Sequence, residues 1–195
     1  MIKNYRQIHY TEREKGVVKT LKEIEDATLS DTYWNVAIPQ SLESTSTNNP
    51  TYLVYLAAQV MRNDVSLLST NILVRDLIGI SGDVHHIFPK AYLKKKGFEK
   101  SRYNQEANYA YLDTQVNKSI GEKAPIDYFI AALEQCETKN ITCGFITDEN
   151  QLKENMRMNC IPEDVFDMDE SRFDEFLEMR RKLMAKKIRN YYEAL

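Results

Sequence analysis

Apolar residues recur at helical spacing near both ends of the chain, and this pattern predicts a mostly helical protein. Val17, Leu21 and Ile24 are spaced i, i+4, i+7 and fall on one face of an N-terminal helix. Pro50 opens a second predicted helix, because proline is favoured at the first helical position. Its apolar positions follow the i, i+3, i+4, i+7, i+8 pattern, namely Leu53, Leu56, Ala57, Val60 and Met61.

The C-terminal part repeats this pattern in two further helices. Pro125 starts the first, whose buried face is predicted to be Ile126, Phe129, Ile130 and Leu133. A long helix is predicted from about Asp169, with the apolar stripe Phe173, Phe176, Leu177, Leu183, Met184, Ile188, Tyr191 and Leu195. Its acidic residues come early and its basic residues, Arg180 among them, come late, which suits the helix dipole. We expect those basic residues to form a solvated face.

The middle of the chain has a different pattern, with short extended segments between turns. The segment 32–50 is predicted to be irregular, and the stretch 68–81 to hold a short helix. DVHHIFP reads as a short strand that Pro89 ends, and NYAYL (108–112) reads as a second strand. A helical turn and a loop separate them, and a short helix follows, with Asp113 or Thr114 as its N-cap. The predicted class is α+β, predominantly α-helical.

Composition places the chain among globular proteins of a reducing compartment. Apolar residues make up 43% and charged residues 28% of the 195 positions. No apolar run approaches the roughly 20 residues that span a bilayer, and the N-terminus is too polar for a secretory signal. The three cysteines form no C-x-x-C pair, so we expect buried thiols, no structural zinc and a cytoplasmic location.

Charge is unevenly distributed along the chain, although the formal net charge is only −3. The stretch from His85 to Lys123 carries a local net charge of +4, which leaves −7 for the rest. A basic island in an acidic chain indicates a polyanionic partner, against the plainer reading of ordinary surface lysines. The candidate phosphate contacts in this stretch are Lys90, Lys94, Lys95, Lys96, Lys100, Arg102, Lys118 and Lys123.

Two of the three histidines, His85 and His86, are adjacent on the first predicted strand. Neighbours on a strand point to opposite faces, so one imidazole can bind a metal while the other takes a proton. Phosphodiester hydrolysis needs an activated water and a stabilised leaving oxygen, which a histidine base and a metal supply. Asn108 and Asn117 follow on the second strand and the short helix, and an amide oxygen suits a hard cation such as Mg²⁺.

The runs DVHHIFP, ANYAYL and NKSIGEKAP resemble the HNH, or ββα-metal, nuclease motif. The resemblance implies that His86 is the general base and that Asn108 braces the loop and orients that base. It also implies that His85 and Asn117 bind a divalent metal, most simply Mg²⁺, with Asp83 as a further candidate. Many HNH domains bind structural zinc through two C-x-x-C pairs, which this chain lacks. The finger is therefore expected to be held by the surrounding helices.

The phrases HHIFPKAYLKKKG, YNQEANYAYLDTQ and IGEKAPIDYF are similar to the C-terminal domain of GmrSD-type, modification-dependent restriction proteins of phage defence. Such proteins usually carry a preceding half with ParB-like, nucleotide-hydrolysing character. The six glycines here form no phosphate-binding loop, so that half is expected to be a missing partner segment. The implied organisation is a helical segment (1–80), the ββα-metal motif (81–124) and a helical segment (125–195) packed as one unit.

Two other classes of function stay open from the sequence. One is an HNH fold that binds nucleic acid without cutting it, and the other is a helical scaffold in which the histidines belong to a polar network. The full set His85, His86, Asn108 and Asn117 favours an enzyme over both. DNA is the expected substrate, although RNA stays open. A homo-oligomer is compatible with the sequence, and a membrane partner is not expected.

Overall fold

The computed structural model describes residues 2–80 and 84–195, with side chains from residue 14 onwards. Asp83, the further metal-ligand candidate, lies outside the described residues. The first half contains α1 (Ile2–Thr28), the π-helix η1 (Tyr33–Ala37), α2 (Ile38–Ser41), α3 (Pro50–Met61) and α4 (Val74–Gly79). The second half contains β1 (Val84–His86), α5 (Lys90–Lys95), α6 (Lys100–Tyr103), η2 (Glu106–Asn108), β2 (Tyr109–Tyr111), α7 (Thr114–Ile120), α8 (Pro125–Thr138), α9 (Glu149–Met158), η3 (Glu163–Asp167), η4 (Glu170–Arg172) and α10 (Phe173–Tyr192).

The architecture is predominantly α-helical with one small sheet, which confirms the predicted α+β class. Strands β1 and β2 pair antiparallel, with His86 opposite Tyr109 and Val84 opposite Tyr111. The short helix α7 follows β2 directly, and the Asp113 side chain caps it by accepting a hydrogen bond from the Gln115 amide, 2.8 Å. Strand, strand and helix therefore succeed one another as the sequence pattern predicts, with α5 and α6 inserted between the strands.

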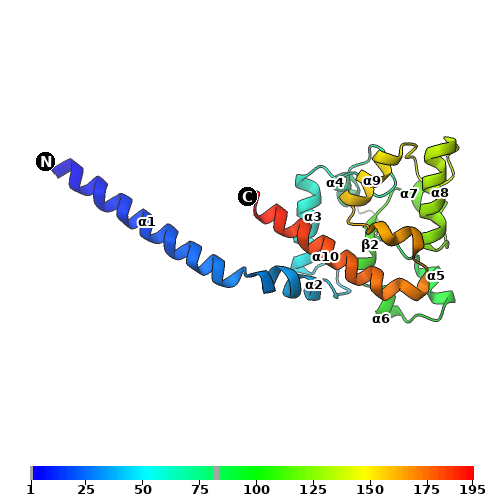
Figure 1. Cartoon of the computed structure of the whole chain (residues 1–195), viewed down its shortest axis with the longest axis horizontal. Coiled ribbons are helices and arrows are strands. Elements are labelled where there is room, and N and C mark those ends of the chain that lie inside the picture. Colours follow the sequence, from blue (N-terminus) through cyan, green and yellow to red (C-terminus); the bar gives the residue numbers. More distant parts are fainter. Residues whose placement is uncertain (1, 81–83) are drawn as a thin grey trace.

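Helix α1 extends away from the globular part of the chain, while α10 crosses that part from end to end (Figure 1). Every side chain from Glu14 to Thr28 is exposed, and Leu29 is the first residue of this region to pack against the core. Tyr192 near the end of α10 donates a hydrogen bond to Glu25, 2.5 Å, at the base of α1. In the part of the chain that the structure describes, no helix is long and apolar enough to cross a membrane.

Several predictions about individual segments are wrong. The segment 32–50 is not wholly irregular, because η1 and α2 occupy its first half and bury Trp34 and Ile38. The long C-terminal helix begins at Phe173 rather than near Asp169, since the 3₁₀ turn η4 precedes it.

The buried faces of three helices also differ from the predicted stripes. Leu53, Val60 and Met61 of α3 are exposed, and Tyr52, Tyr55 and Ala58 are buried instead. The tyrosine rings carry large apolar surfaces into the core, and the predicted stripe of α3 left them out. Exposed positions among the other predicted core residues are Ile130, Leu183 and Leu195.

The predicted solvated face of α10 has one important exception, because Arg180 is only 1% exposed. Its guanidinium donates hydrogen bonds to the carbonyl oxygens of Ala107 (2.8 Å), Tyr109 (2.7 Å) and Asn159 (3.2 Å). A second tie comes from α8, where the buried Tyr128 hydroxyl donates to the carbonyl oxygen of Ile87, 2.9 Å. Side chains from α8 and α10 thus bond the backbone of β2 and of the residue that follows β1.

Gly144 is a position that only glycine fits. Its φ is +71°, and a Cβ there would meet the Leu68 carbonyl oxygen at 2.6 Å. We expect Gly144→Ala to lower the free energy of unfolding by about 3 kcal/mol, from the left-handed backbone and the clash together. Gly97 also has a positive φ (+85°) but open space around it, so Gly97→Ala isolates the backbone cost of about 1 kcal/mol. Equal losses in urea unfolding of the two variants would contradict the steric argument.

Candidate functional site

His86 sits at the end of β1 with its ring half-buried and its orientation fixed from three sides. Its Nε2 donates a hydrogen bond to Oδ1 of Asn104, 2.9 Å. The rings of Tyr109 and Tyr103 meet it edge to face, with centroids 5.2 and 6.2 Å away. Tyr109, which lies opposite His86 in the sheet, therefore packs against its ring. With Nε2–H engaged by Asn104, the neutral imidazole keeps the lone pair on Nδ1.

The electrostatic surroundings keep this imidazole neutral at neutral pH. Burial lowers the pKa of His86 below its ordinary value near 6.5, and electrostatic interactions with Lys90 and His85 lower it further. The hydrogen bond to Asn104 acts in the opposite direction and is outweighed by burial. A neutral histidine can accept a proton, so the ring is in the state that a general base requires.

Asn108 ties the two ends of the loop between the strands together. The side chain is fully buried, and its Oδ1 accepts a hydrogen bond from the Phe88 amide, 2.8 Å. Its Nδ2 donates to the carbonyl oxygens of Tyr103 (3.0 Å) and Phe88 (3.2 Å). Both hydrogens of Nδ2 and one lone pair of Oδ1 are used within the protein, so the Asn108 side chain braces the backbone on both sides of the loop.

Asn104 is the site residue that the sequence reasoning missed. It lies just after α6, at the C-cap of that helix, and its side chain is half-buried. Nothing in its spacing marks it, because its partner His86 is 18 residues earlier and the contact depends on how α5 and α6 fold back. An amide close after a helical turn in the loop of the motif is the only signal that the sequence offers.

The predicted metal ligands His85 and Asn117 lie on β1 and α7, which are separated by α5, α6, η2 and β2. His85 is half-buried on β1, and Asn117 is half-buried on α7, one turn after its N-cap. Among the side chains that the structure describes, in residues 14–80 and 84–195, no group of three or more His, Cys, Asp or Glu is arranged to hold a metal ion. The predicted set differs from such a group, because it contains an amide. One imidazole and one amide oxygen form a sparse, partly hard donor set, compatible with a Mg²⁺ ion that keeps several waters.

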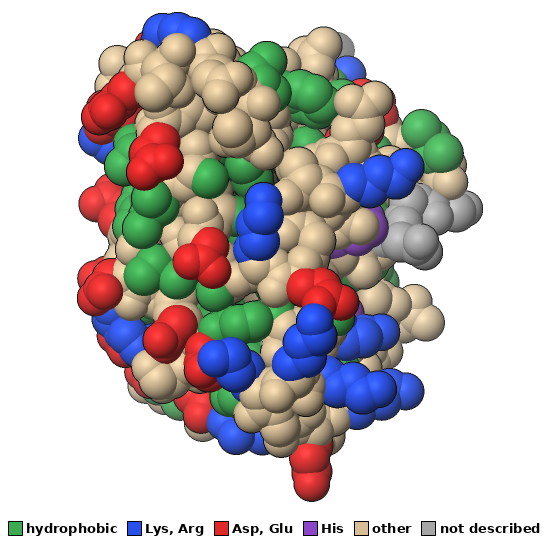
Figure 2. Space-filling view, turned by 90° about the vertical axis from the view of Figure 1, so that its right-hand side faces the viewer, with side chains coloured by type: hydrophobic (Ala, Val, Ile, Leu, Met, Phe, Trp, Pro, Cys, Tyr) green, Lys and Arg blue, Asp and Glu red, His purple; other side chains and the backbone are tan. Residues whose placement is uncertain are grey.

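The candidate phosphate contacts divide into engaged and available cations. Lys95 pairs with Glu122, Lys96 with Glu170 (2.6 Å) and Arg102 with Asp174 (2.7 Å). Lys123 donates to the Ser119 carbonyl oxygen, 2.9 Å. The exposed cations that remain without such a partner in the described chain are Lys90, Lys94, Lys100 and Lys118. On this face, Lys and Arg side chains gather beside a partly covered histidine (Figure 2).

Glu106 is a buried acid two residues before Asn108, and nothing in the sequence pattern marks it. The residue is fully buried, and its Oε2 accepts a hydrogen bond from Asn49, 2.9 Å, while no hydrogen bond reaches Oε1 from the described residues. Burial raises its pKa to about 7, against the smaller opposing effects of Asn49 and Ser44. The carboxyl is therefore about half protonated at neutral pH.

This shift predicts a pH-dependent stability. The folded pKa is raised above the unfolded value of 4.5, so the stabilising contribution is complete below pH 4.5 and lost as pH rises through about 7. Glutamine stays neutral at every pH. We therefore expect the unfolding free energy of Glu106→Gln, relative to that of wild type, to increase by about 2 kcal/mol as the pH rises from 5 to 8. Denaturant melts at several pH values measure this difference. A difference that stays flat with pH would contradict the raised pKa.

Comparison with known proteins gives one distant relative and no family. No protein family matches the chain, and no solved structure matches it. The chain is 31% identical over 118 residues to the uncharacterized protein MJ0686 of Methanocaldococcus jannaschii. The alignment covers 53% of this chain and 20% of that protein, so the chain spans about a fifth of its length.

Proposed function

We propose that the hairpin of β1 and β2, together with α7, is the site of a metal-dependent nuclease that hydrolyses phosphodiester bonds in DNA. The observation that carries the proposal is the fixed orientation of the His86 ring. Its Nε2 is hydrogen-bonded to Asn104, two tyrosine rings pack against it edge to face, and burial lowers its pKa. With Nε2 bonded to Asn104, the nitrogen Nδ1 is left to take a proton from water. A preorganised general base must be able to accept a proton in this way.

The arrangement of the remaining residues fits the same chemistry. Asn108 holds the backbone on both sides of the loop, so His86 is placed by a rigid support. His85 and Asn117, with Asp83, are the proposed ligands of a divalent cation, Mg²⁺ for preference. That cation would stabilise negative charge on the departing oxygen. His86 takes the proton of the attacking water and hands it to solvent afterwards.

DNA is the proposed substrate because available cations surround the hairpin. Lys90 starts α5 directly after the motif, and Lys118 follows Asn117 on α7. Together with Lys94 and Lys100 they could contact backbone phosphates without reading bases. The resemblance to GmrSD-type proteins extends the proposal to the nuclease half of a restriction protein of phage defence. Recognition of modified DNA would then belong to a ParB-like half outside this chain.

Plasmid cleavage tests the proposal. We expect wild type to cut supercoiled DNA with Mg²⁺ or Mn²⁺ and not with EDTA, and His86→Ala to be slower by about 1,000-fold. His9→Ala, which removes the one histidine outside the motif, is the matched control and should cut normally. His86→Ala cutting at the wild-type rate would overturn the assignment of the base. DNA binding without cleavage by either protein would favour a nucleic-acid-binding module instead.

A further inference from the structure

The loop between α2 and α3, residues 42–49, is fastened to η2 by the buried acid Glu106. The backbone amide of Glu106 donates a hydrogen bond to the carbonyl oxygen of Ser44, 3.0 Å. Its side-chain Oε2 accepts a hydrogen bond from Nδ2 of Asn49, 2.9 Å. The side chains between these two points, residues 45–48, are exposed. One residue therefore fastens both ends of this segment, which we call the 42–49 loop.

The 42–49 loop is also connected to the ring that packs against His86. The Tyr109 hydroxyl donates a hydrogen bond to the carbonyl oxygen of Thr45, 3.2 Å. The same tyrosine ring meets His86 edge to face, with centroids 5.2 Å apart. Release of the loop would therefore free the hydroxyl end of Tyr109 and loosen one support of the histidine.

The Glu106 carboxyl is poorly placed to carry a negative charge while this loop is closed. The residue is fully buried, and no hydrogen bond from the described residues reaches its Oε1. An isolated buried carboxylate is costly, because the protein interior solvates its charge weakly. The protonated carboxyl avoids most of this cost and still accepts the hydrogen bond from Asn49.

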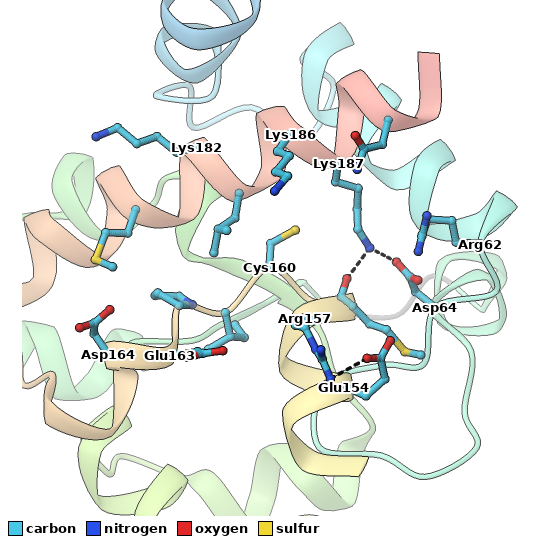
Figure 3. Close-up of a pocket in the computed structure, with 16 residues that line it drawn as sticks. Arg62, Asp64, Glu154, Arg157, Cys160, Glu163, Asp164, Lys182, Lys186 and Lys187 are labelled. Atoms are coloured by element: carbon cyan, nitrogen blue, oxygen red, sulfur yellow. Dashed lines mark hydrogen bonds and ion pairs between the residues drawn. The ribbon is translucent and has the colours of Figure 1, made fainter. Parts of the chain in front are cut away.

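A second buried acid, Asp64, shows how this fold compensates a buried carboxylate elsewhere. It is 2% exposed, and Nζ of Lys187 pairs with it beside the cavity between α9 and α10 (Figure 3). Lys187 thereby opposes the effect of burial on the pKa of Asp64. Glu106 forms no ion pair with any residue that the structure describes, so a charge on it has no comparable compensation.

The groups around Glu106 leave it as the one that changes charge near neutral pH. The hydroxyls of Tyr52, from α3, and Tyr109, from β2, interact with it electrostatically. Burial raises the pKa of both hydroxyls, so both stay neutral up to pH 8. From α10, Arg180 and Arg181 bond to other groups, and neither pairs with Glu106.

From this geometry we infer that the 42–49 loop is a pH-dependent clasp on the hairpin, closed while Glu106 is neutral and released when it ionises. Opening lets water solvate the carboxylate, which the closed loop prevents. Burial raises the pKa of Glu106 from 4.5 to about 7 in the closed form. The closed form is thus fully favoured below pH 4.5 and is lost as the pH rises through about 7. The inference does not depend on the proposed nuclease activity.

Amide hydrogen exchange on the full chain, followed by NMR, tests the inference at the backbone amides of Glu106 and Asn49. From pH 5 to pH 8 the ratio of closed to open loop, and with it their protection factors, should fall roughly 50-fold. Glu106→Gln should keep its protection over this range. Glu43→Gln, which removes an exposed carboxyl from the same loop, is the matched control and should follow wild type. Tyr109→Phe should lower protection at every pH and keep the pH dependence.

Two further measurements make the test decisive. Opening of one loop exposes little surface, so exchange of the two amides should respond little to low urea concentrations, unlike exchange through global unfolding. A ¹³C NMR titration of the Glu106 carboxyl measures its pKa in wild type, which covers the case of a Glu106→Gln protein that fails to fold. A carboxyl that titrates near 4.5, a steep urea dependence, or equal pH dependence in wild type and Glu106→Gln would overturn the inference.

Discussion

Replacing Arg180 by alanine is expected to lower the free energy of unfolding by about 3 to 5 kcal/mol. The guanidinium is buried and bonds the carbonyl oxygens of Ala107, Tyr109 and Asn159. Its loss leaves these acceptors without a partner in a dry interior, at about 1 to 3 kcal/mol for each. The effect also reaches the site, since Ala107 and Tyr109 flank Asn108. Urea unfolding followed by circular dichroism measures the change.

Two further variants separate charge from packing at this position. Arg180→Met fills much of the same volume but donates no hydrogen bond, so we expect it to recover only part of the loss. Lys182→Ala, two residues later, removes an exposed cation whose one ion pair with a described residue is to Glu178, and it should change stability by about 0.5 kcal/mol or less. An Arg180→Ala protein as stable as the Lys182→Ala control would show that the hydrogen bonds of Arg180 to the three carbonyl oxygens do not stabilise the fold.

Asn104→Ala is expected to slow DNA cleavage by about 100-fold while leaving the fold intact. The reason is that Asn104 Oδ1 accepts the Nε2–H of His86 and so selects the tautomer with a basic Nδ1. Without this acceptor both tautomers become populated and the ring is less fixed. ¹⁵N NMR of the imidazole nitrogens reports the tautomer directly, including in a protein without measurable cleavage.

Conservative replacement provides the control for this role. Asn104→Asp keeps an oxygen acceptor and should preserve the Nε2–H tautomer, whereas Asn104→Ala should not. Gln105→Ala alters the next residue, whose side chain bonds Arg181 (3.1 Å), and should leave the His86 resonances unchanged. Identical imidazole spectra for wild type and Asn104→Ala would contradict the positioning role. Such spectra would not test the role of His86 as the base, which the cleavage assay of His86→Ala tests separately.

The local elements around the motif were predictable because each depends on neighbours in the sequence. Asp113 caps α7, Pro125 starts α8, and the alternation of Tyr109 and Tyr111 marks β2. Capping, proline geometry and strand alternation act over a few residues, so a single sequence carries them. The order of strand, strand and helix followed from the same signals. The predicted place of Asn108 was wrong, because Asn108 ends the 3₁₀ helix η2 and the second strand begins only at Tyr109.

The faces that those elements bury could not be predicted from spacing alone. On α3 the tyrosines Tyr52 and Tyr55 turn inward and Leu53 turns outward, because the neighbouring helices α10 and α4 set the direction of burial. The same holds for Glu106, whose raised pKa comes from burial and not from its neighbours along the chain. Hydrophobicity of a residue type is a weak guide where amphipathic side chains share the core.

The sequence by itself determined the helical class, the hairpin and the pair of histidines with its candidate chemistry. Tertiary structure alone decided which groups support His86. Asn104, which bonds His86, is 18 residues from it in the sequence, and Arg180, which bonds β2, is more than 70 residues from that strand. Such contacts depend on the relative placement of whole helices, to which many weak packing terms contribute together. No short pattern encodes that sum, so the surroundings of the histidine became visible only in the folded chain.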